Sequence, residues 1–274
     1  TSTTANAAKI LSRLLLVRLP MVLPGVDGAS HGSFAPARAQ AAMRGLLTCV
    51  NHPIAMPHRP ARPPLHDTAA WLLGRALTAS DGTPATELAA AAARLPCPVP
   101  EPLRTFYAAV GRTPALMQGF QRFAAPHEWE CLGDKLLFLE ENQAVCWWAT
   151  DAQQRVWQTT DLDAPDWHEE DVGLDAFMHT IAYYQMAQGG YPFCGMRACH
   201  GFSTQGDLAA LLHAMQAQAV VDVAGLRIFT VGPQALVWYL HAEGALAEPG
   251  LFLSALDADR FEALCAQWDF DDLG

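Results

Sequence analysis

Two cysteines and a histidine near residue 200 are residue types from which a hydrolase or a zinc site could be built. A Cys194/His200 pair would supply a thiol nucleophile and a base. Adding Cys199 would sketch a set of zinc ligands. The Cys-x4-Cys-His spacing fits no common zinc module, however, and a second clustered pair of ligands is missing. The sequence therefore favours a packed loop here and predicts no metal site.

Adjacent carboxylates at Glu140 and Glu141 could act as a general acid and a general base, because paired carboxyl groups can have separated pKa values. They lie between two β-prone runs, Leu136–Leu139 and Ala144–Ala149. Consecutive side chains of a strand point to opposite faces, so these two would not converge on one substrate. A polar hairpin turn, with Asn142 providing the turn chemistry, is the favoured interpretation.

Other catalytic motifs are missing from the sequence. The stretch from Gly201 to Gly206 reads GFSTQG, which is not a nucleophile elbow because its second glycine comes one residue too late. Ser203 or Thr204 is expected to cap the following helix instead. Neither a Walker loop nor a GxGxxG motif occurs, so phosphates and dinucleotides would lack their usual backbone cradle, and no cofactor is predicted.

Charge is distributed unevenly along the 274 residues. Residues 1–100 contain nine Lys/Arg and four Asp/Glu, a net charge of +5, whereas residues 101–274 contain eight and twenty-four, a net charge of −16. An acidic body repels nucleic acids and membrane surfaces and attracts basic proteins. The simpler interpretation is that the charge keeps the protein in solution. Half of the residues are apolar, enough for a sizeable core, yet no run of eighteen apolar residues predicts a spanning helix.

The seven cysteines do not have the spacing of a small disulfide-rich module, and Cys146 and Cys265 lie in apolar runs. This pattern predicts reduced, buried thiols in a cytoplasmic protein. Residues 1–64 differ from the rest, being rich in Ala, Pro and Arg, and are predicted to form a poorly ordered leader. Part of this leader has the outline of a signal peptide, but Arg13, Arg18 and Pro20 interrupt its apolar region.

Hydrophobic periodicity and capping residues predict an α+β fold with a mixed, largely antiparallel sheet, helices packed on it, and a C-terminal helix–strand–helix extension. The α+β body would span residues 65–190 and the extension residues 191–274. The predicted helices are one capped by Asp67 that runs through Trp71–Leu77, then Thr83–Arg94, Pro102–Val110, Leu174–Gln188, Asp207–Gln218, and a last one capped by Asp257. The predicted strands are Leu136–Leu139, Ala144–Ala149, Arg155–Gln158, Ala219–Val223, Leu226–Val231, Ala235–Leu240 and Leu251–Leu253.

Two features could form a recognition surface. Trp147 and Trp148 should face opposite sides of a strand, which places one in the core and leaves the other for an interface. Five carboxylates cluster before and at the start of the helix that begins at Leu174, where they could compensate the helix dipole or form an acidic docking patch. They are Asp166, Glu169, Glu170, Asp171 and Asp175.

Three segments carry a family resemblance. Pro100–Gly111 reads PEPLRTFYAAVG, Leu136–Trp148 reads LLFLEENQAVCWW, and Val156–Gln158 reads VWQ. Together they resemble the SUKH superfamily, bacterial relatives of the fungal cell-wall-assembly regulator, over about residues 100–190. The Glu-Asn-Gln tripeptide before an aromatic strand is distinctive, whereas the Phe-Tyr helix is generic.

The resemblance implies a non-enzymatic α+β domain, without catalytic residues, that binds and neutralises a cognate polymorphic toxin in the cytoplasm. The acidic C-terminal part independently suits a basic toxin partner. The candidate partner-binding residues are Glu169, Glu170, Asp171, Glu140, Glu141 and Trp148. Two alternatives stay open: a small hydrolase using Cys194/His200 or Glu140/Glu141, and a regulatory scaffold module.

Overall fold

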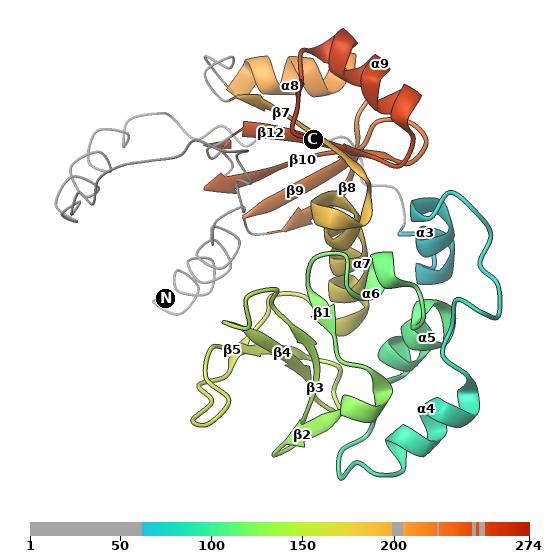
Figure 1. Ribbon diagram of the computed structural model, residues 1–274. Coiled ribbons are helices and arrows are strands. Elements are labelled where there is room, and N and C mark those ends of the chain that lie inside the picture. The colour runs from blue at the N-terminus through green and yellow to red at the C-terminus, as the bar shows by residue number, and fades with distance from the viewer. Residues whose placement is uncertain (1–61, 199–204, 224, 243–244, 247–249) are drawn as a thin grey trace, which may run out of the picture.

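The computed structural model describes residues 62–198, 205–223, 225–242, 245–246 and 250–274. Within them it has an α+β fold, as predicted (Figure 1). The helices are α3 (Leu65–Leu72), α4 (Ala85–Ala92), α5 (Glu101–Val110), α6 (Pro114–Met117), α7 (Leu174–Gln185), α8 (Gln205–Ala214) and α9 (Ala258–Trp268), with a 3-10 turn η1 (Pro126–Glu128) and a π-helical turn η2 (Met186–Gly190). The predicted leader, residues 1–64, lies outside the described residues up to position 61.

The first sheet, here called sheet A, is antiparallel with the order β1-β3-β4-β5-β6, and β2 pairs with β3. Its strands are β1 (Arg122–Phe123), β2 (Glu130–Leu132), β3 (Lys135–Glu140), β4 (Trp147–Thr150), β5 (Val156–Thr159) and β6 (His168–Glu169). Leu136 pairs with Thr150, and Trp148 pairs with Gln158. This register places Trp148 on the side that packs against α7, and Trp147 on the opposite side.

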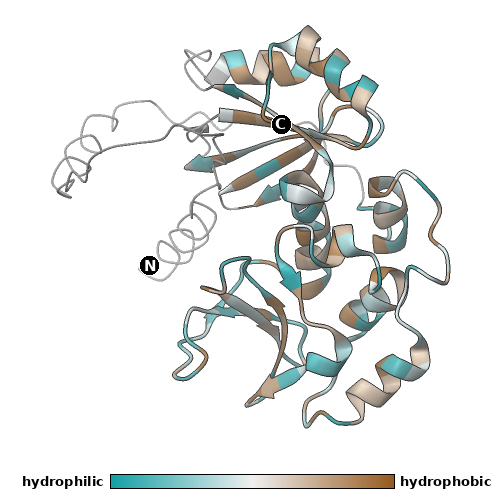
Figure 2. Ribbon diagram, viewed as in Figure 1, coloured by the Kyte–Doolittle hydropathy of each residue, from teal (hydrophilic) through white to brown (hydrophobic). Residues whose placement is uncertain are grey.

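The second sheet, sheet B, follows the order β13-β7-β12-β10-β9-β8, with β11 paired to β10, and all its pairings are antiparallel. Its strands are β7 (Phe193–Ala198), β8 (Gln218–Val223), β9 (Leu226–Thr230), β10 (Ala235–Ala242), β11 (Ala245–Leu246), β12 (Gly250–Ala255) and β13 (Asp271–Asp272). Helices α8 and α9 cover one face of the sheet, and their mixture of polar and apolar residues is typical of amphipathic helices (Figure 2).

Helix α7 lies between the two sheets and joins their cores (Figure 1). Its Phe177 ring lies 5.9 Å from the ring of Phe138 in sheet A. The same cluster of buried apolar residues extends through Ile181 to Leu226 and Trp238 of sheet B. Sheet A and sheet B are therefore connected through continuous apolar packing, and any ligand or side chain entering between them would contact α7.

The predicted hairpin of the resemblance region is confirmed, but its turn is longer than expected. Strands β3 and β4 are adjacent and antiparallel, and the Glu141 N–H donates to the Cys146 carbonyl at 2.8 Å. Ala144 has a φ of 55°, a left-handed conformation that a strand residue does not adopt. The strand predicted to start at Ala144 therefore begins at Trp147, because the polar residues and Ala144 close the turn.

Helix boundaries follow the prolines more closely than the predicted caps. Helix α5 has Pro102 in its first turn and Gly111 at its C-terminus, as predicted. Helix α3 begins after Pro64, so Asp67 lies in its first turn and is not the cap that the sequence predicted. Asp257 does cap α9, and its side chain accepts the Arg260 N–H at 2.9 Å.

Two further sequence predictions are wrong in the part of the chain that is described. Cys97 and Cys131, predicted to be reduced, form a disulfide with their Cα atoms 6.4 Å apart, because the segment after α4 passes β2. Cys194, predicted to lie in a packed loop, lies on strand β7, which pairs with β12 along six residues. No helix of the described ranges is long and apolar enough to cross a membrane.

Candidate functional site

The six candidate residues from the sequence separate into a buried and an exposed group. Glu141, Trp148 and Glu170 line one pocket, with 4%, 6% and 8% of their surface exposed. Glu169 and Asp171 are exposed at the edge strand β6 and just after it. Glu140 is partly buried and pairs with Arg122 at 2.6 Å. The side chains of Glu169, Glu170 and Asp171 alternate between solvent and the pocket. The residues that the sequence predicted as one acidic patch are therefore divided between two sites.

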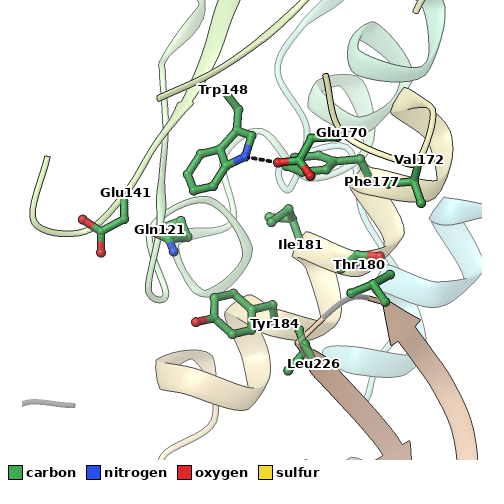
Figure 3. A pocket seen from close by; sticks show the side chains of 11 residues that line it. Gln121, Glu141, Trp148, Glu170, Val172, Phe177, Thr180, Ile181, Tyr184 and Leu226 are labelled. Carbon is green, nitrogen blue, oxygen red and sulfur yellow. Dashed lines mark hydrogen bonds between the residues drawn. The ribbon is translucent and has the colours of Figure 1, made fainter. Parts of the chain in front are cut away.

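The pocket lies between strand β4, helix α7 and the β8–β9 hairpin (Figure 3). Its volume is about 60 Å³, several times the roughly 10–15 Å³ that one water molecule needs. The walls are mostly apolar or aromatic, and few polar groups face them. The lining residues are Gln121, Glu141, Trp148, Glu170, Val172, Phe177, Thr180, Ile181, Tyr184, Val223 and Leu226. The pocket is therefore lined by segments that are far apart in sequence, from Gln121 to Leu226.

Glu170 is the polar centre of the pocket. Its backbone N–H donates to the Val156 carbonyl at 2.9 Å, which continues the pairing of β5 with β6 and aims the side chain inward. The Trp148 indole N–H donates to Glu170 Oε1 at 2.8 Å (Figure 3). Burial raises the pKa of Glu170 to about 7; the Trp148 hydrogen bond opposes this shift and the neighbouring Asp171 charge adds to it. Near neutral pH the protonated and ionised forms of this carboxyl group are therefore both populated.

Glu141 and Gln121 close the other end of the pocket. Glu141 Oε2 accepts the Gln143 N–H at 2.7 Å, and Gln121 Oε1 accepts the Asn142 N–H at 2.8 Å, so both side chains hold the β3–β4 turn. Figure 3 shows the Glu141 carboxyl group on the far side of the Trp148 indole from Glu170. The two buried carboxyl groups therefore do not form an acid/base pair.

A second cluster occupies the opposite face of sheet A. Lys135 Nζ lies 4.7 Å from the ring centre of Trp157 and 5.9 Å from that of Trp167. The Arg155 guanidinium also contacts the Trp157 ring, at 4.8 Å, and pairs with buried Asp151 at 2.7 Å. Burial raises the pKa of Asp151, but hydrogen bonds from Trp157 and Arg155 more than offset this and lower it overall. These tryptophans are only partly buried and already hold cations.

The residues of the hydrolase alternative are not brought together. Cys194 Sγ lies 4.0 Å from the Ser254 hydroxyl, and burial raises the pKa of this thiol, whereas a nucleophilic cysteine needs a lowered pKa. Its proposed partner His200, like Cys199, lies outside the described residues. Glu140 and Glu141 face different surroundings, as their positions in the hairpin predicted. Among the described side chains there is no group of three or more potential metal ligands.

Sequence reasoning missed most of the pocket walls. Phe177, Ile181 and Tyr184 lie on one face of α7, within the predicted helix Leu174–Gln188, but apolar periodicity does not distinguish residues that line a pocket from residues in solid packing. Nothing in the sequence around Gln121, Val223 or Leu226 indicated that these residues line a pocket. Comparison with known proteins adds nothing to this picture, because no family model, curated protein or solved structure matches the chain.

Proposed function

We propose that the protein is a non-enzymatic binding protein of the SUKH kind, an immunity protein that neutralises a basic toxin. The observation that supports this most strongly is an exposed band of carboxylates at the β6 edge of sheet A. We call it the acidic edge. It comprises Asp161, Asp163, Asp166, Glu169, Asp171 and Asp175.

The acidic edge is weakly compensated by positive charge. From residue 156 to residue 196 the sequence contains no lysine or arginine. Basic side chains from outside this segment contact two of its carboxylates: Arg155 lies 4.0 Å from Glu169, and Arg62 donates a hydrogen bond to Asp175 at 3.3 Å. Exposed ion pairs of this kind contribute little to stability, and they leave most of the negative electrostatic potential of the acidic edge uncompensated. A basic surface approaching this edge would therefore be attracted over several ångströms.

Helix-dipole compensation, the simpler interpretation, accounts for only part of this edge. Asp175 is in the first turn of α7, where a negative charge stabilises the helix. The other five carboxylates precede the helix, in the connection from β5 through β6. Trp157 pairs with Glu169 across β5 and β6, which places an aromatic ring beside the carboxylates. That ring already contacts Lys135 and Arg155, so the exposed carboxylates are the groups left to meet the basic side chains of a partner.

The hydrolase alternative is less well supported, because neither Cys194 nor the Glu140/Glu141 pair has a converging partner in the described residues. A regulatory scaffold module would use the same surface to bind a protein that is not a toxin. The test therefore has to establish both toxin neutralisation and the location of the binding face.

Charge reversal provides that test. Any toxic domain found to be encoded beside the gene would be co-expressed with the chain, and cell survival measured. Glu169→Lys with Asp171→Lys should abolish protection and slow association at least tenfold, because steering by exposed charges dominates on-rates. Raising the salt concentration should slow association of the unmodified protein in the same way. Thermal stability should change little, since exposed substitutions typically cost within about 0.5 kcal/mol.

The matched control is Asp259→Lys with Glu262→Lys, the same change in charge on exposed positions of α9. This variant should protect as the unmodified protein does. Equal loss of protection in both variants would assign the effect to net charge and not to the acidic edge. An unmodified protein that fails to protect against the toxin would overturn the immunity proposal itself.

A further inference from the structure

The pocket described above has a composition that selects the charge of its ligand. One end carries the Glu170 carboxyl group, and the charge that acts on it is the like charge of Asp171. The other end carries Glu141. An anion would meet these carboxyl groups without a compensating cation. Above its pKa of about 7, Glu170 is ionised, and a neutral apolar molecule would leave that buried charge unpaired, which is costly.

The side chains that form the walls of the pocket determine what the uncharged part of the ligand has to be. Phe177, Ile181 and Leu226 present apolar surface, and Trp148 and Tyr184 add aromatic rings (Figure 3). Trp148 satisfies only one oxygen of Glu170, Oε1, so Oε2 is left to accept a further hydrogen bond. An ammonium group can donate to this oxygen and neutralise its charge, and the apolar and aromatic walls suit the body of such a ligand.

We propose that this pocket binds a small organic ammonium ion with an apolar body, an alkylamine or an arylalkylamine, with Glu170 as its counter-charge. The ammonium group donates to Glu170 Oε2, and the apolar body lies between α7 and the β8–β9 hairpin. The lining residues belong to both sheets, so a bound ligand contacts sheet A and the β8–β9 hairpin at the same time. The site is separate from the acidic edge, whose carboxylates face solvent, so it does not depend on the proposed toxin partner.

The ligand test uses two probes of the same shape. 2-Phenylethylamine and 2-phenylethanol would be titrated into the full chain by calorimetry at pH 8. The amine should bind at least tenfold more tightly than the alcohol, because only the amine neutralises Glu170. Glu170→Gln keeps an acceptor for the Trp148 N–H but removes the charge, and it should erase the preference for the amine. Glu169→Gln, the exposed neighbour, is the control and should leave both affinities unchanged.

A pH series on the unmodified protein tests the same site without a substitution. The titratable groups around Glu170 are Asp171 beside it, Glu141 from the β3–β4 turn, Cys146 before β4, and Tyr184 from α7, while the hairpin contributes apolar side chains. Protonation of Glu170 competes with the amine, so amine affinity should fall roughly tenfold from pH 8 to pH 6. Alcohol affinity should stay level. Equal binding of the two probes, no binding of the amine in the millimolar range, or a pH-independent amine affinity would each overturn the proposal.

Discussion

At the residue scale, two adjacent carboxyl groups, one on β6 and one just after it, have opposite surroundings. Glu170 has the same residue type and the same sequence neighbourhood as Glu169, yet its side chain is buried beside an indole while Glu169 is exposed. The difference arises from strand alternation at the edge of sheet A. A carboxyl group in this environment prefers to be neutral, so folding and protonation of Glu170 are linked.

The linkage between folding and protonation makes the stability of the protein depend on pH. The folded pKa of Glu170, about 7, exceeds its ordinary value of 4.5, so the folded state binds the proton more tightly. Its contribution to stability is favourable below pH 4.5 and is lost as the pH rises through 7. Glu170→Gln, which never ionises, should therefore match the unmodified protein near pH 4.5 and be more stable at pH 8, by on the order of 3 kcal/mol.

Urea denaturation at both pH values measures this difference. Glu169→Gln serves as the control, and it should produce no pH-dependent difference because its carboxylate is exposed. If Glu170→Gln were less stable than the unmodified protein at pH 8, the carboxylate would have to be ionised and favourably paired in the folded state.

At the scale of elements, a single amide joins helix α7 to the segment before sheet A. Gln185 Oε1 accepts the N–H groups of Phe120 and Gln121 at 2.8 and 2.7 Å, and its Nε2 donates to the carbonyls of Leu116 and Gln121 at 3.2 and 2.6 Å. Gln185 is fully buried. Four backbone groups of an irregular segment thus depend on one side chain, and Gln121 is also part of the pocket.

Replacing that amide by an apolar side chain of similar size should strongly destabilise the folded protein. Gln185→Leu leaves four buried backbone groups unpaired, and unsatisfied groups typically cost about 1–3 kcal/mol each, so a loss of at least about 3 kcal/mol is expected in the free energy of unfolding. Gln188→Leu on the following turn removes one hydrogen bond, to the Tyr184 hydroxyl at 3.2 Å, and should cost about 1 kcal/mol. Urea denaturation compares the two, and equal small losses would mean that water replaces the Gln185 amide.

At the scale of the whole molecule, two sheets share α7, and a disulfide ties the helical N-terminal part to sheet A. Cys97 follows α4 and Cys131 lies on β2, 34 residues apart in sequence. Disulfides persist mainly in oxidising compartments. The cytoplasmic location was predicted from a pattern of reduced cysteines, so this disulfide removes part of its support and the location stays a prediction.

Removing the cross-link should lower stability without changing the fold. Cys97→Ser with Cys131→Ser should cost about 2–4 kcal/mol, because the reduced chain gains loop entropy when it unfolds. A thiol reductant should lower the melting temperature of the unmodified protein and have no effect on the double variant. An intact mass that shows both thiols free in the protein purified without reductant would contradict the disulfide.

Much of the local structure followed from the sequence alone. The predicted helix Pro102–Val110 matches α5 to within one residue, Asp257 capped α9, and the polar tetrad between two apolar runs predicted the β3–β4 hairpin, because caps and turns depend on residues a few positions apart. The opposite orientations of Trp147 and Trp148 followed from strand alternation in the same way. These features could be predicted because their causes are contained within a single turn or strand.

Only the tertiary structure decided which of those side chains meet. Strand β7 forms because β12 lies beside it, and the Cys97–Cys131 bond forms because the segment after α4 passes β2. The pocket joins Trp148 and Glu170 to Leu226 of the β8–β9 hairpin. Such contacts depend on the path of the whole chain and on the packing of α7 against both sheets, and no local pattern of residue types encodes them. For that reason the sequence assigned Glu170 to an exposed acidic patch, whereas the fold buried it.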